Sequence, residues 1–164
     1  MSGQTLIADE ILAWHRINAL LQSYADAVDR GDIAAILNVF SADAVWDYRP
    51  GLSFHGRHEI GGFFAERLAV YERTSHHIGS PLVSAGGGRG EYRSTAYFSA
   101  LHRLKDQSRY TVYGRYVDVV TVDDADTRIK SRRIIAHVLE DSDKAYYMLE
   151  RVPAAADGAA HDVD

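Results

Sequence analysis

With 164 residues and a hydrophobic fraction of 46%, the chain is long enough for one domain with a substantial core and too apolar for wholesale disorder. Its net charge of -5 comes with scattered Lys and Arg and no basic stripe, which argues against nucleic acid as a partner. The absence of cysteine excludes disulfides, thiolate catalysis and cysteine-based zinc sites. The first ten residues lack the pattern of a signal peptide, and no stretch is apolar enough to span a bilayer, so we expect a cytoplasmic protein without a membrane partner.

Helical patterns dominate the N-terminal half. Apolar residues at helical spacing predict a first helix over Ala8–Asp29. Gly31 is suited to ending this helix, and Asp32 to capping a second one over Ile33–Phe40. The following elements are expected to be a turn at 41–43, a strand over Ala44–Tyr48, a loop, a short strand at Phe54–His55 and a helix over roughly His58–Tyr71.

From Thr74 onward the apolar pattern has a period of two, which is typical of strands. Short turns join the four expected strands, which requires antiparallel neighbours, over Thr74–Ser84, Glu91–Arg103, Arg109–Val122 and Arg128–Leu139. Helices followed by a curved antiparallel sheet predict a single α+β domain over residues 1–152, a cone whose mouth suits a small apolar molecule. The Ala-, Asp- and Gly-rich residues 153–164 are expected to be a disordered tail.

Two segments far apart in the sequence carry the residues that point to chemistry. Asp29 ends the first predicted helix, and His76 and His77 lie near the start of the strand that follows the third. A carboxylate beside an imidazole fixes the ring tautomer and stabilises the imidazolium, so the ring can take up and return a proton. Asp29 and His76 are therefore candidate catalytic residues. The alternative is that Asp29 is a polar residue at a helix end and that both histidines are structural.

Strand geometry ranks several polar residues. Successive strand residues point to opposite faces, so at most one of His76 and His77 can line a pocket on the concave side. His76 is preferred, and His77 is expected at the surface or against a helix. Asp118 and Arg132 are expected to form a structural ion pair between neighbouring strands.

Further side chains are candidates for contact with a substrate. Tyr48 and Tyr116 are strand aromatics, for which core packing is the default, although a hydroxyl that faces an apolar pocket could polarise a carbonyl. Trp46 belongs to the same predicted strand as Tyr48. His102 ends a long strand, where it could face either the pocket or the sheet edge.

The eight histidines do not form a metal motif. His55 and His58, like His76 and His77, lack the helical spacing and the carboxylate neighbours of zinc sites. Residues 86–90 form a predicted hairpin turn rather than a dinucleotide-binding loop. We therefore expect neither a metal nor an organic cofactor.

Several short motifs, in their order and spacing, resemble those of SnoaL-like domains over roughly Leu12–His137. They are Tyr24-x-x-x-Val28-Asp29-Arg-Gly-Asp32, Val39-Phe40-Ser-x-Asp43-Ala44-Val45, Gly56 before a helix with Phe63-Phe64, Thr74-Ser-His76-His77, the strand ending at His102, Gly114-Arg-Tyr116-x-Asp118 and Arg128-Ile129-x-x-Arg132. Two positions depart from the family pattern. Thr127 stands where the family usually has Trp, and no histidine lies in the Gly114-Arg-Tyr116 segment, where scytalone dehydratase has its second histidine.

The resemblance implies the cone-shaped, cystatin-like α+β barrel of the nuclear transport factor 2-like superfamily, with a curved, mixed and mostly antiparallel sheet wrapped around N-terminal helices. The family includes polyketide cyclases, dehydratases, a dehydrochlorinase and small subunits of aromatic-ring dioxygenases. In the dehydratase and dehydrochlorinase branch an Asp–His dyad removes a proton, and its members correspond to Asp29 and His76 here. A tyrosine that matches Tyr24 lines the pocket in some members.

Two functions follow as hypotheses. The first is a cofactor-free lyase or isomerase that acts on a small, largely apolar carbonyl or ring compound, with His76 as the base and Asp29 as its partner. The second is a non-catalytic ligand-binding or dimerisation module, such as a small subunit of an aromatic-ring dioxygenase. A homodimer or homotrimer is expected in either case, because long antiparallel strands leave one sheet face to be covered.

Overall fold

The computed structural model describes residues 3–123 and 125–141, with the backbone alone for residues 3–8. The helices are α1 (Gly3–Arg30), α2 (Ile33–Asn38) and α3 (Gly56–Val70). The strands are β1 (Phe40–Arg49), β2 (Leu52–His55), β3 (Tyr71–Ile78), β4 (Leu82–Ala85), β5 (Glu91–Leu104), β6 (Arg109–Val122) and β7 (Thr127–Glu140).

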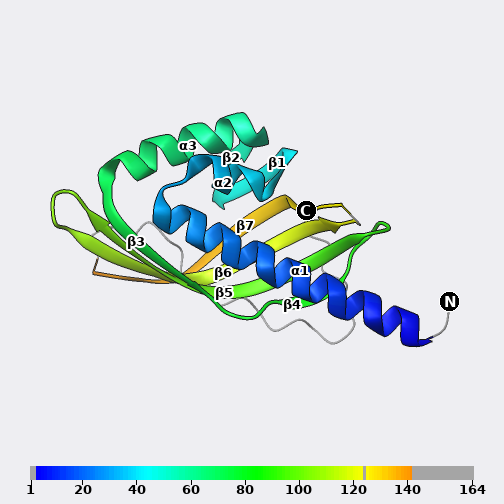
Figure 1. The fold of residues 1–164 in the computed structure, drawn as a ribbon. Coiled ribbons are helices and arrows are strands. Elements are labelled where there is room, and N and C mark those ends of the chain that lie inside the picture. The colour runs from blue at the N-terminus through cyan, green and yellow to red at the C-terminus, as the bar shows by residue number, and fades with distance from the viewer. Residues whose placement is uncertain (1–2, 124, 142–164) are drawn as a thin grey trace.

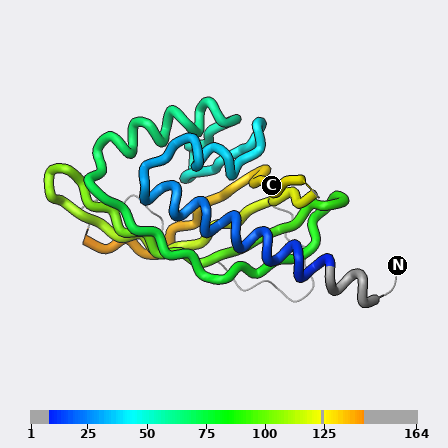
Figure 2. Tube along the Cα trace, in the orientation of Figure 1, coloured from blue at the N-terminus to red at the C-terminus, as the bar shows by residue number. Residues whose placement is uncertain are grey.

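The strands form one curved sheet in the order β2-β1-β7-β6-β5-β3, and β4 pairs with β5 beside β3. β5, β6 and β7 are long antiparallel neighbours, whereas β1 joins β7 in parallel. Figure 1 shows α1, α2 and α3 on the same side of this sheet. Figure 2 traces how the chain leaves α1, turns back through α2 and β1, and reaches α3 on that side. The predicted α+β class with a mixed, mostly antiparallel sheet is confirmed.

The core lies between the helices and the concave face of the sheet. Ile17 and Leu21 of α1 are fully buried in one cluster with Val120 of β6 and Ile129 of β7. Strand residues alternate between this cluster and the opposite face, as the period of two predicts. The inner face of the sheet is therefore where side chains from α1, α3 and the strands can meet.

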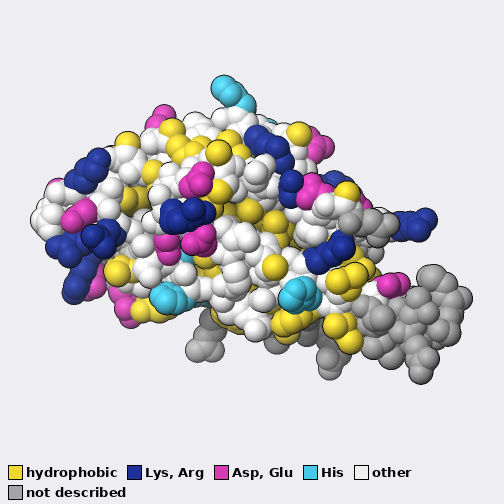
Figure 3. Space-filling view, in the orientation of Figure 1, with side chains coloured by type: hydrophobic (Ala, Val, Ile, Leu, Met, Phe, Trp, Pro, Cys, Tyr) yellow, Lys and Arg dark blue, Asp and Glu magenta, His cyan; other side chains and the backbone are white. Residues whose placement is uncertain are grey.

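The opposite, outer face of the sheet is covered by no helix within the described residues. It carries several exposed apolar side chains, namely Tyr97, Leu101, Tyr113 and Val138. On the helix side of the molecule, Figure 3 shows positive and negative side chains interspersed, without a large patch of one sign. Among the described residues, no helix combines the length and apolar character that a membrane crossing requires.

The end of α1 is built as predicted, and it places Asp29. Gly31 has a φ of +68° and donates its backbone N–H to the Val28 carbonyl at 3.0 Å, which closes the helix. The Asp32 side chain then accepts the Ala35 N–H at 2.9 Å and caps α2. Two short-range devices therefore fix the last turn of α1, which carries Asp29 toward the sheet.

The predicted boundary between α2 and β1 is wrong. α2 ends at Asn38, and β1 begins at Phe40 instead of following a turn at 41–43. Phe40 is fully buried and lies opposite Ile129, whose N–H is donated to the Val39 carbonyl at 2.8 Å. This pairing is with the last strand of the sheet, so the local sequence does not show it.

Two more boundaries differ around β3. α3 ends at Val70, and Tyr71 begins β3 opposite Leu104, so the predicted helix runs one residue too far. The single strand predicted over Thr74–Ser84 is two strands, β3 and β4, because Pro81 has no N–H to donate to a ladder. The predicted tail over residues 153–164 lies outside the described residues.

Candidate functional site

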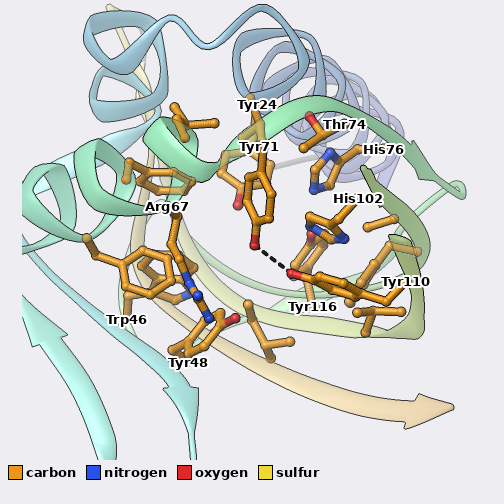
Figure 4. A pocket seen from close by; sticks show the side chains of 18 residues that line it. Tyr24, Trp46, Tyr48, Arg67, Tyr71, Thr74, His76, His102, Tyr110 and Tyr116 are labelled. Carbon is orange, nitrogen blue, oxygen red and sulfur yellow. Dashed lines mark hydrogen bonds between the residues drawn. The ribbon is translucent and has the colours of Figure 1, made fainter. Parts of the chain in front are cut away.

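An open cavity, with about 70 Å³ accessible to the centres of water-sized molecules, lies between the helices and the concave face of the sheet. Figure 4 shows side chains from the helices and from the inner strands converging on it. The described lining residues are Tyr24, Val28, Trp46, Tyr48, Phe63, Phe64, Arg67, Leu68, Tyr71, Thr74, His76, Phe98, Ala100, His102, Tyr110, Val112, Tyr116 and Ile134. The cavity is therefore mostly apolar and aromatic, with a few polar groups that face one space, as small-molecule sites usually are.

His76 lines this cavity, and its ring contacts Asp29, which does not itself line the cavity. The Asp29 Oδ1 atom lies 2.7 Å from His76 Nδ1, and Asp29 Oδ2 accepts the backbone N–H of His76 at 2.8 Å. Thr74 adds a third bond, from Oγ1 to Asp29 Oδ1 at 2.8 Å. The His76 side chain is 6% exposed and that of Asp29 28%. The end of α1 and the strand β3 therefore hold one carboxylate and one imidazole in a fixed relation.

The hydrogen bonds of Asp29 decide its charge. Partial burial alone would raise the pKa of the Asp29 carboxyl, but bonds from the His76 ring, the His76 backbone and Thr74 outweigh it and lower the pKa. The group is thus an ionised carboxylate at neutral pH, and an ionised carboxylate can only accept. We therefore assign the proton of the neutral His76 ring to Nδ1, which leaves Nε2 able to accept a proton.

A second imidazole, that of His102 on β5, lies beside the first. Its ring centroid is 5.5 Å from that of His76, and its other face stacks on Tyr110 at 4.5 Å. Burial, and then repulsion from His76, lower the pKa of His102 to about 3, although the nearby backbone of Ala100 acts slightly in the opposite direction. His102 is consequently neutral at physiological pH and lines the cavity rather than the sheet edge.

The tyrosine and tryptophan candidates also line the cavity. Tyr24 and Tyr116 meet edge to face at 5.8 Å, and burial raises the pKa of both hydroxyls, so both are neutral. Tyr116 stacks on Phe98 at 4.2 Å. Trp46 is 1% exposed and meets Tyr48 edge to face at 5.5 Å. The structure thus brings Tyr24, Trp46, Tyr48, His76, His102 and Tyr116 to one space, with Asp29 bonded to His76 but not lining the cavity, while their roles stay predictions.

Below Tyr24 lies the predicted ion pair between β6 and β7, which is confirmed. Arg132 donates to both carboxylate oxygens of Asp118, at 2.9 and 2.8 Å, and the side chains are 0% and 1% exposed. The guanidinium carbon lies 4.3 Å from the Tyr24 ring centroid and 4.2 Å from that of Tyr116. This pair supports the cavity floor and does not line the cavity.

Four polar lining residues were not among the sequence candidates. Thr74 shares the strand face of His76, which is a signal that strand parity offers. Tyr110 lies opposite His102 in the β5–β6 pairing, so the hairpin register could have found it. Arg67 belongs to the last turn of α3, and Tyr71 begins β3, where the predicted end of the helix lies one residue too late.

His77 points away from the cavity. Its side chain is exposed, and its Nε2 lies 3.2 Å from the Ser75 hydroxyl. Among residues 3–123 and 125–141, no three or more His, Cys, Asp or Glu side chains gather as a metal site would need. Among the described residues, the main polar groups that line the cavity are two imidazoles, several hydroxyls and one guanidinium.

Comparisons with known proteins agree with this architecture. Among solved structures, the model matches a provisionally named scytalone dehydratase from Novosphingobium aromaticivorans with a TM-score of 0.75, at 20% identity over 81% of this chain and 89% of the other. A provisionally named aromatic ring hydroxylase from the same organism matches at 0.74, with 29% identity over 80% and 94% of the two chains. A hexachlorocyclohexane dehydrochlorinase (LinA, type 2) matches at 0.73, with 12% identity over 93% and 99%. No curated protein matches the sequence.

The family assignment rests on the sequence itself. The family model described as "SnoaL-like domain" matches residues 9–133, which span α1 through the first half of β7 and include both Asp29 and His76. The cone of helices and curved sheet is the fold expected of that family. The chain belongs to the SnoaL-like domain family.

Proposed function

We propose that this protein is a cofactor-free acid/base enzyme, a lyase of the dehydratase kind or an isomerase, acting on a small, largely apolar carbonyl or ring compound. The observation that carries this proposal is the 2.7 Å contact between Asp29 and His76, because the His76 ring lines an open, mostly apolar cavity. In a structural His–Asp pair, the histidine would not need to line a cavity. A ligand within this cavity would meet His76 directly.

The proposed reaction starts with proton removal from carbon. Nε2 of His76 takes the proton, and Asp29 stabilises the imidazolium that forms. The electron pair of the broken C–H bond moves toward an adjacent carbonyl, whose oxygen gains negative charge next to the hydroxyl of Tyr24 or Tyr48. In an elimination the pair then forms a C=C bond as the leaving group departs. In an isomerisation the imidazolium returns the proton to a different carbon.

The similar structures support this reading at the level of reaction class. Two of them carry names of elimination enzymes, a scytalone dehydratase and a dehydrochlorinase. Their identities to this chain are 20% and 12%, so the likeness is one of fold. The proposal of an acid/base reaction therefore rests on the Asp29–His76 pair and the cavity of this chain itself.

The direct test compares His76→Ala with the unchanged protein on a panel of β-hydroxy ketones and related elimination substrates. Removal of a positioned base lowers turnover by about 10²–10⁴-fold, and we expect a loss of that size in kcat. His77→Ala is the matched control, because His77 is the next residue of the same strand but exposed. Equal turnover in His76→Ala and the parent would reject the base assignment.

A second candidate function, a non-catalytic module, has two observations in its favour. The structure with 29% identity is named as an aromatic ring hydroxylase, and the outer face of the sheet exposes apolar side chains that include Tyr97 and Leu101. On this reading the outer face pairs with another subunit, either a second or third copy of this chain or a larger enzyme. Tyr97→Glu should then change the oligomeric state seen by light scattering. An unchanged oligomeric state in Tyr97→Glu would mean that the outer face of the sheet is not the interface between subunits.

A further inference from the structure

The last turn of α3 places one cation at the mouth of the cavity. Arg67 is the only Lys or Arg among the described lining residues, and no described Asp or Glu lines the cavity. Figure 4 shows its guanidinium extending along the cavity wall toward the Tyr48 side chain. Its guanidinium carbon also lies 5.7 Å from the Phe63 ring centroid. The stem and head of this exposed residue are thus held at the entrance.

The groups around Arg67 do not neutralise it. Burial tends to lower the pKa of the guanidinium, but Tyr71, Tyr48 and then Tyr110 outweigh it and raise the pKa. Among the described residues, no carboxylate forms an ion pair with Arg67. Burial raises the pKa of Tyr71 as well, so that hydroxyl is neutral and able to donate. One positive charge thus lies at the rim of a mostly apolar cavity, in reach of a ligand inside it.

A pair of tyrosines continues from Arg67 toward the histidines. The Tyr71 and Tyr110 hydroxyl oxygens lie 2.5 Å apart, and Figure 4 shows this bond crossing the cavity. The Tyr110 ring stacks on His102, whose ring in turn meets His76. A ligand that reaches from Arg67 to His76 would therefore pass hydroxyl donors at its charged end and aromatic surface along its length.

We propose that Arg67, together with the Tyr48 and Tyr71 hydroxyls, binds an anionic oxygen of the substrate, so that the substrate is an apolar ring compound carrying a carboxylate or an ionised phenol. Guanidinium groups bind such oxygens through paired, charge-assisted hydrogen bonds. The anion would be held at the mouth of the cavity, with the C–H bond that reacts turned toward His76. This inference rests on the proposed acid/base function for its second half only, because anion binding at Arg67 needs no turnover.

The test compares two ligands of equal shape, 2-naphthoate and 2-naphthamide, by calorimetry on the full chain. The unchanged protein should bind naphthoate more tightly. Arg67→Gln should weaken naphthoate binding by about ten- to a hundredfold, the range for hydrogen bonds to charged groups, and leave naphthamide binding unchanged. Arg49→Gln is the matched control, because Arg49 is exposed, carries the same charge and lines the neighbouring outer groove instead of the cavity. It should alter neither affinity.

Three outcomes would overturn the inference. One is equal affinity of the unchanged protein for the two ligands, or no binding of naphthoate. Another is equal weakening of both ligands in Arg67→Gln, which would indicate a packing role. The third is the same loss of naphthoate affinity in Arg49→Gln, which would indicate the general charge of the protein. A parallel series with 4-nitrophenol above and below its own ionisation pH separates a phenolate site, where binding follows ionisation, from a carboxylate site, where the phenol does not bind in either form.

Failure of this inference can be told apart from failure of the proposed function. Binding of naphthoate that depends on Arg67, with no turnover that depends on His76, would keep the anion site and reject the base. Turnover of neutral ketones that depends on His76, without tighter binding of naphthoate than of naphthamide, would keep the base and reject the anion site. His76→Gln should keep the preference for naphthoate over naphthamide, since the anion is placed at Arg67 and not at His76.

Discussion

Two pairs in this molecule join an aspartate to a basic side chain of another element and have opposite surroundings. Asp118 and Arg132 form a bidentate pair at 2.9 and 2.8 Å whose side chains are 1% and 0% exposed. Asp29 and His76 form a single side-chain bond at 2.7 Å, and their side chains are 28% and 6% exposed, with the His76 ring at a cavity wall. In the first pair, the Arg132 guanidinium contacts the Asp118 carboxylate and the rings of Tyr24 and Tyr116. The second leaves one ring nitrogen for a ligand.

The difference teaches that surroundings, rather than residue type, separate support from chemistry. Sealing a pair inside the core makes each charge depend on the other, because an unpaired buried charge is very costly. Placing one member of a pair at a cavity wall lets it change its protonation state while water and ligand remain in reach. Mutations that remove one partner should therefore damage stability in the first pair and activity in the second.

Arg132→Met should produce the largest change. It leaves the Asp118 carboxylate buried without its cation, and breaking such a pair costs about 3–5 kcal/mol in the free energy of unfolding. Urea titration followed by tryptophan fluorescence measures the loss. Arg133→Met is the control, because Arg133 is the next residue, is exposed, and lies 3.8 Å from Asp47; exposed pairs are worth about 0–1 kcal/mol. Similar losses in the two variants would remove the distinction between the sealed pair and a surface pair.

Adding Asp118→Leu to Arg132→Met sharpens this result. Replacing both charges with apolar groups removes the uncompensated carboxylate, so much of the lost stability should return. A double variant that is less stable than Arg132→Met alone would show that Asp118 has a structural task beyond its bond to Arg132.

Asp29→Asn should behave in the opposite way. An amide cannot stabilise the His76 imidazolium as a carboxylate does, so turnover should fall about 100-fold or more. The free energy of unfolding should fall by only about 1.5–3 kcal/mol, the range for a hydrogen bond to a charged group, because an amide oxygen still accepts some of the three bonds. Steady-state kinetics and urea titration on the same preparation give both numbers. Asp26→Asn is the control, because Asp26 loses the same charge one turn earlier in α1, where it pairs with Arg30 at the surface.

The acid dependence of stability should reveal His102. The pKa of His102 is about 3 in the folded protein and near 6.5 in the unfolded chain. Between these two pH values the unfolded chain therefore binds a proton at His102 that the folded protein does not bind. Stability therefore falls as the pH drops, by about 2 kcal/mol between pH 7 and pH 5. Asp29 acts in a lower window: its lowered pKa adds stability that is present above the ordinary aspartate pKa and lost below about pH 4.

Urea titrations at pH 7 and pH 5 on His102→Gln isolate that contribution. The variant no longer carries the imidazole, so its loss of stability on acidification should be smaller than in the unchanged protein by about 2 kcal/mol. His77→Gln removes an exposed histidine from the neighbouring strand and should keep the full loss. An unchanged pH response in His102→Gln would mean that another group causes the acid sensitivity.

Much of the sheet and part of the site could be predicted from the sequence for physical reasons. The β6–β7 hairpin has a short turn, so its register follows from the alternating pattern, and Asp118 indeed lies opposite Arg132. Asp29 was placed by local helix signals, since Gly31 and Asp32 act within one turn of it. Strand parity and the family resemblance together selected His76.

The rest depends on contacts between distant segments. The start of β1 at Phe40 is set by β7, which the local pattern does not contain. An arginine in the last turn of a helix, such as Arg67, normally faces solvent alone, and only the position of α3 over the cavity places it at the cavity rim as well. Tyr71 was assigned to the end of that helix, where its hydroxyl would not have reached the inner face of the sheet.

Tyr71→Phe should give the smallest effect of the set and completes the comparison with a neutral bond. It removes the 2.5 Å hydrogen bond to Tyr110 at the wall of the cavity that His76 also lines. Because no charge is left buried and water can enter the open cavity, the free energy of unfolding should fall by about 1 kcal/mol. Tyr113→Phe is the control, since its hydroxyl bonds Glu140 at 3.2 Å on the exposed outer face, and it should cost less. A loss in Tyr71→Phe as large as that of Arg132→Met would mean that the cavity wall is as sealed as the core, and the contrast between the two regions would fail.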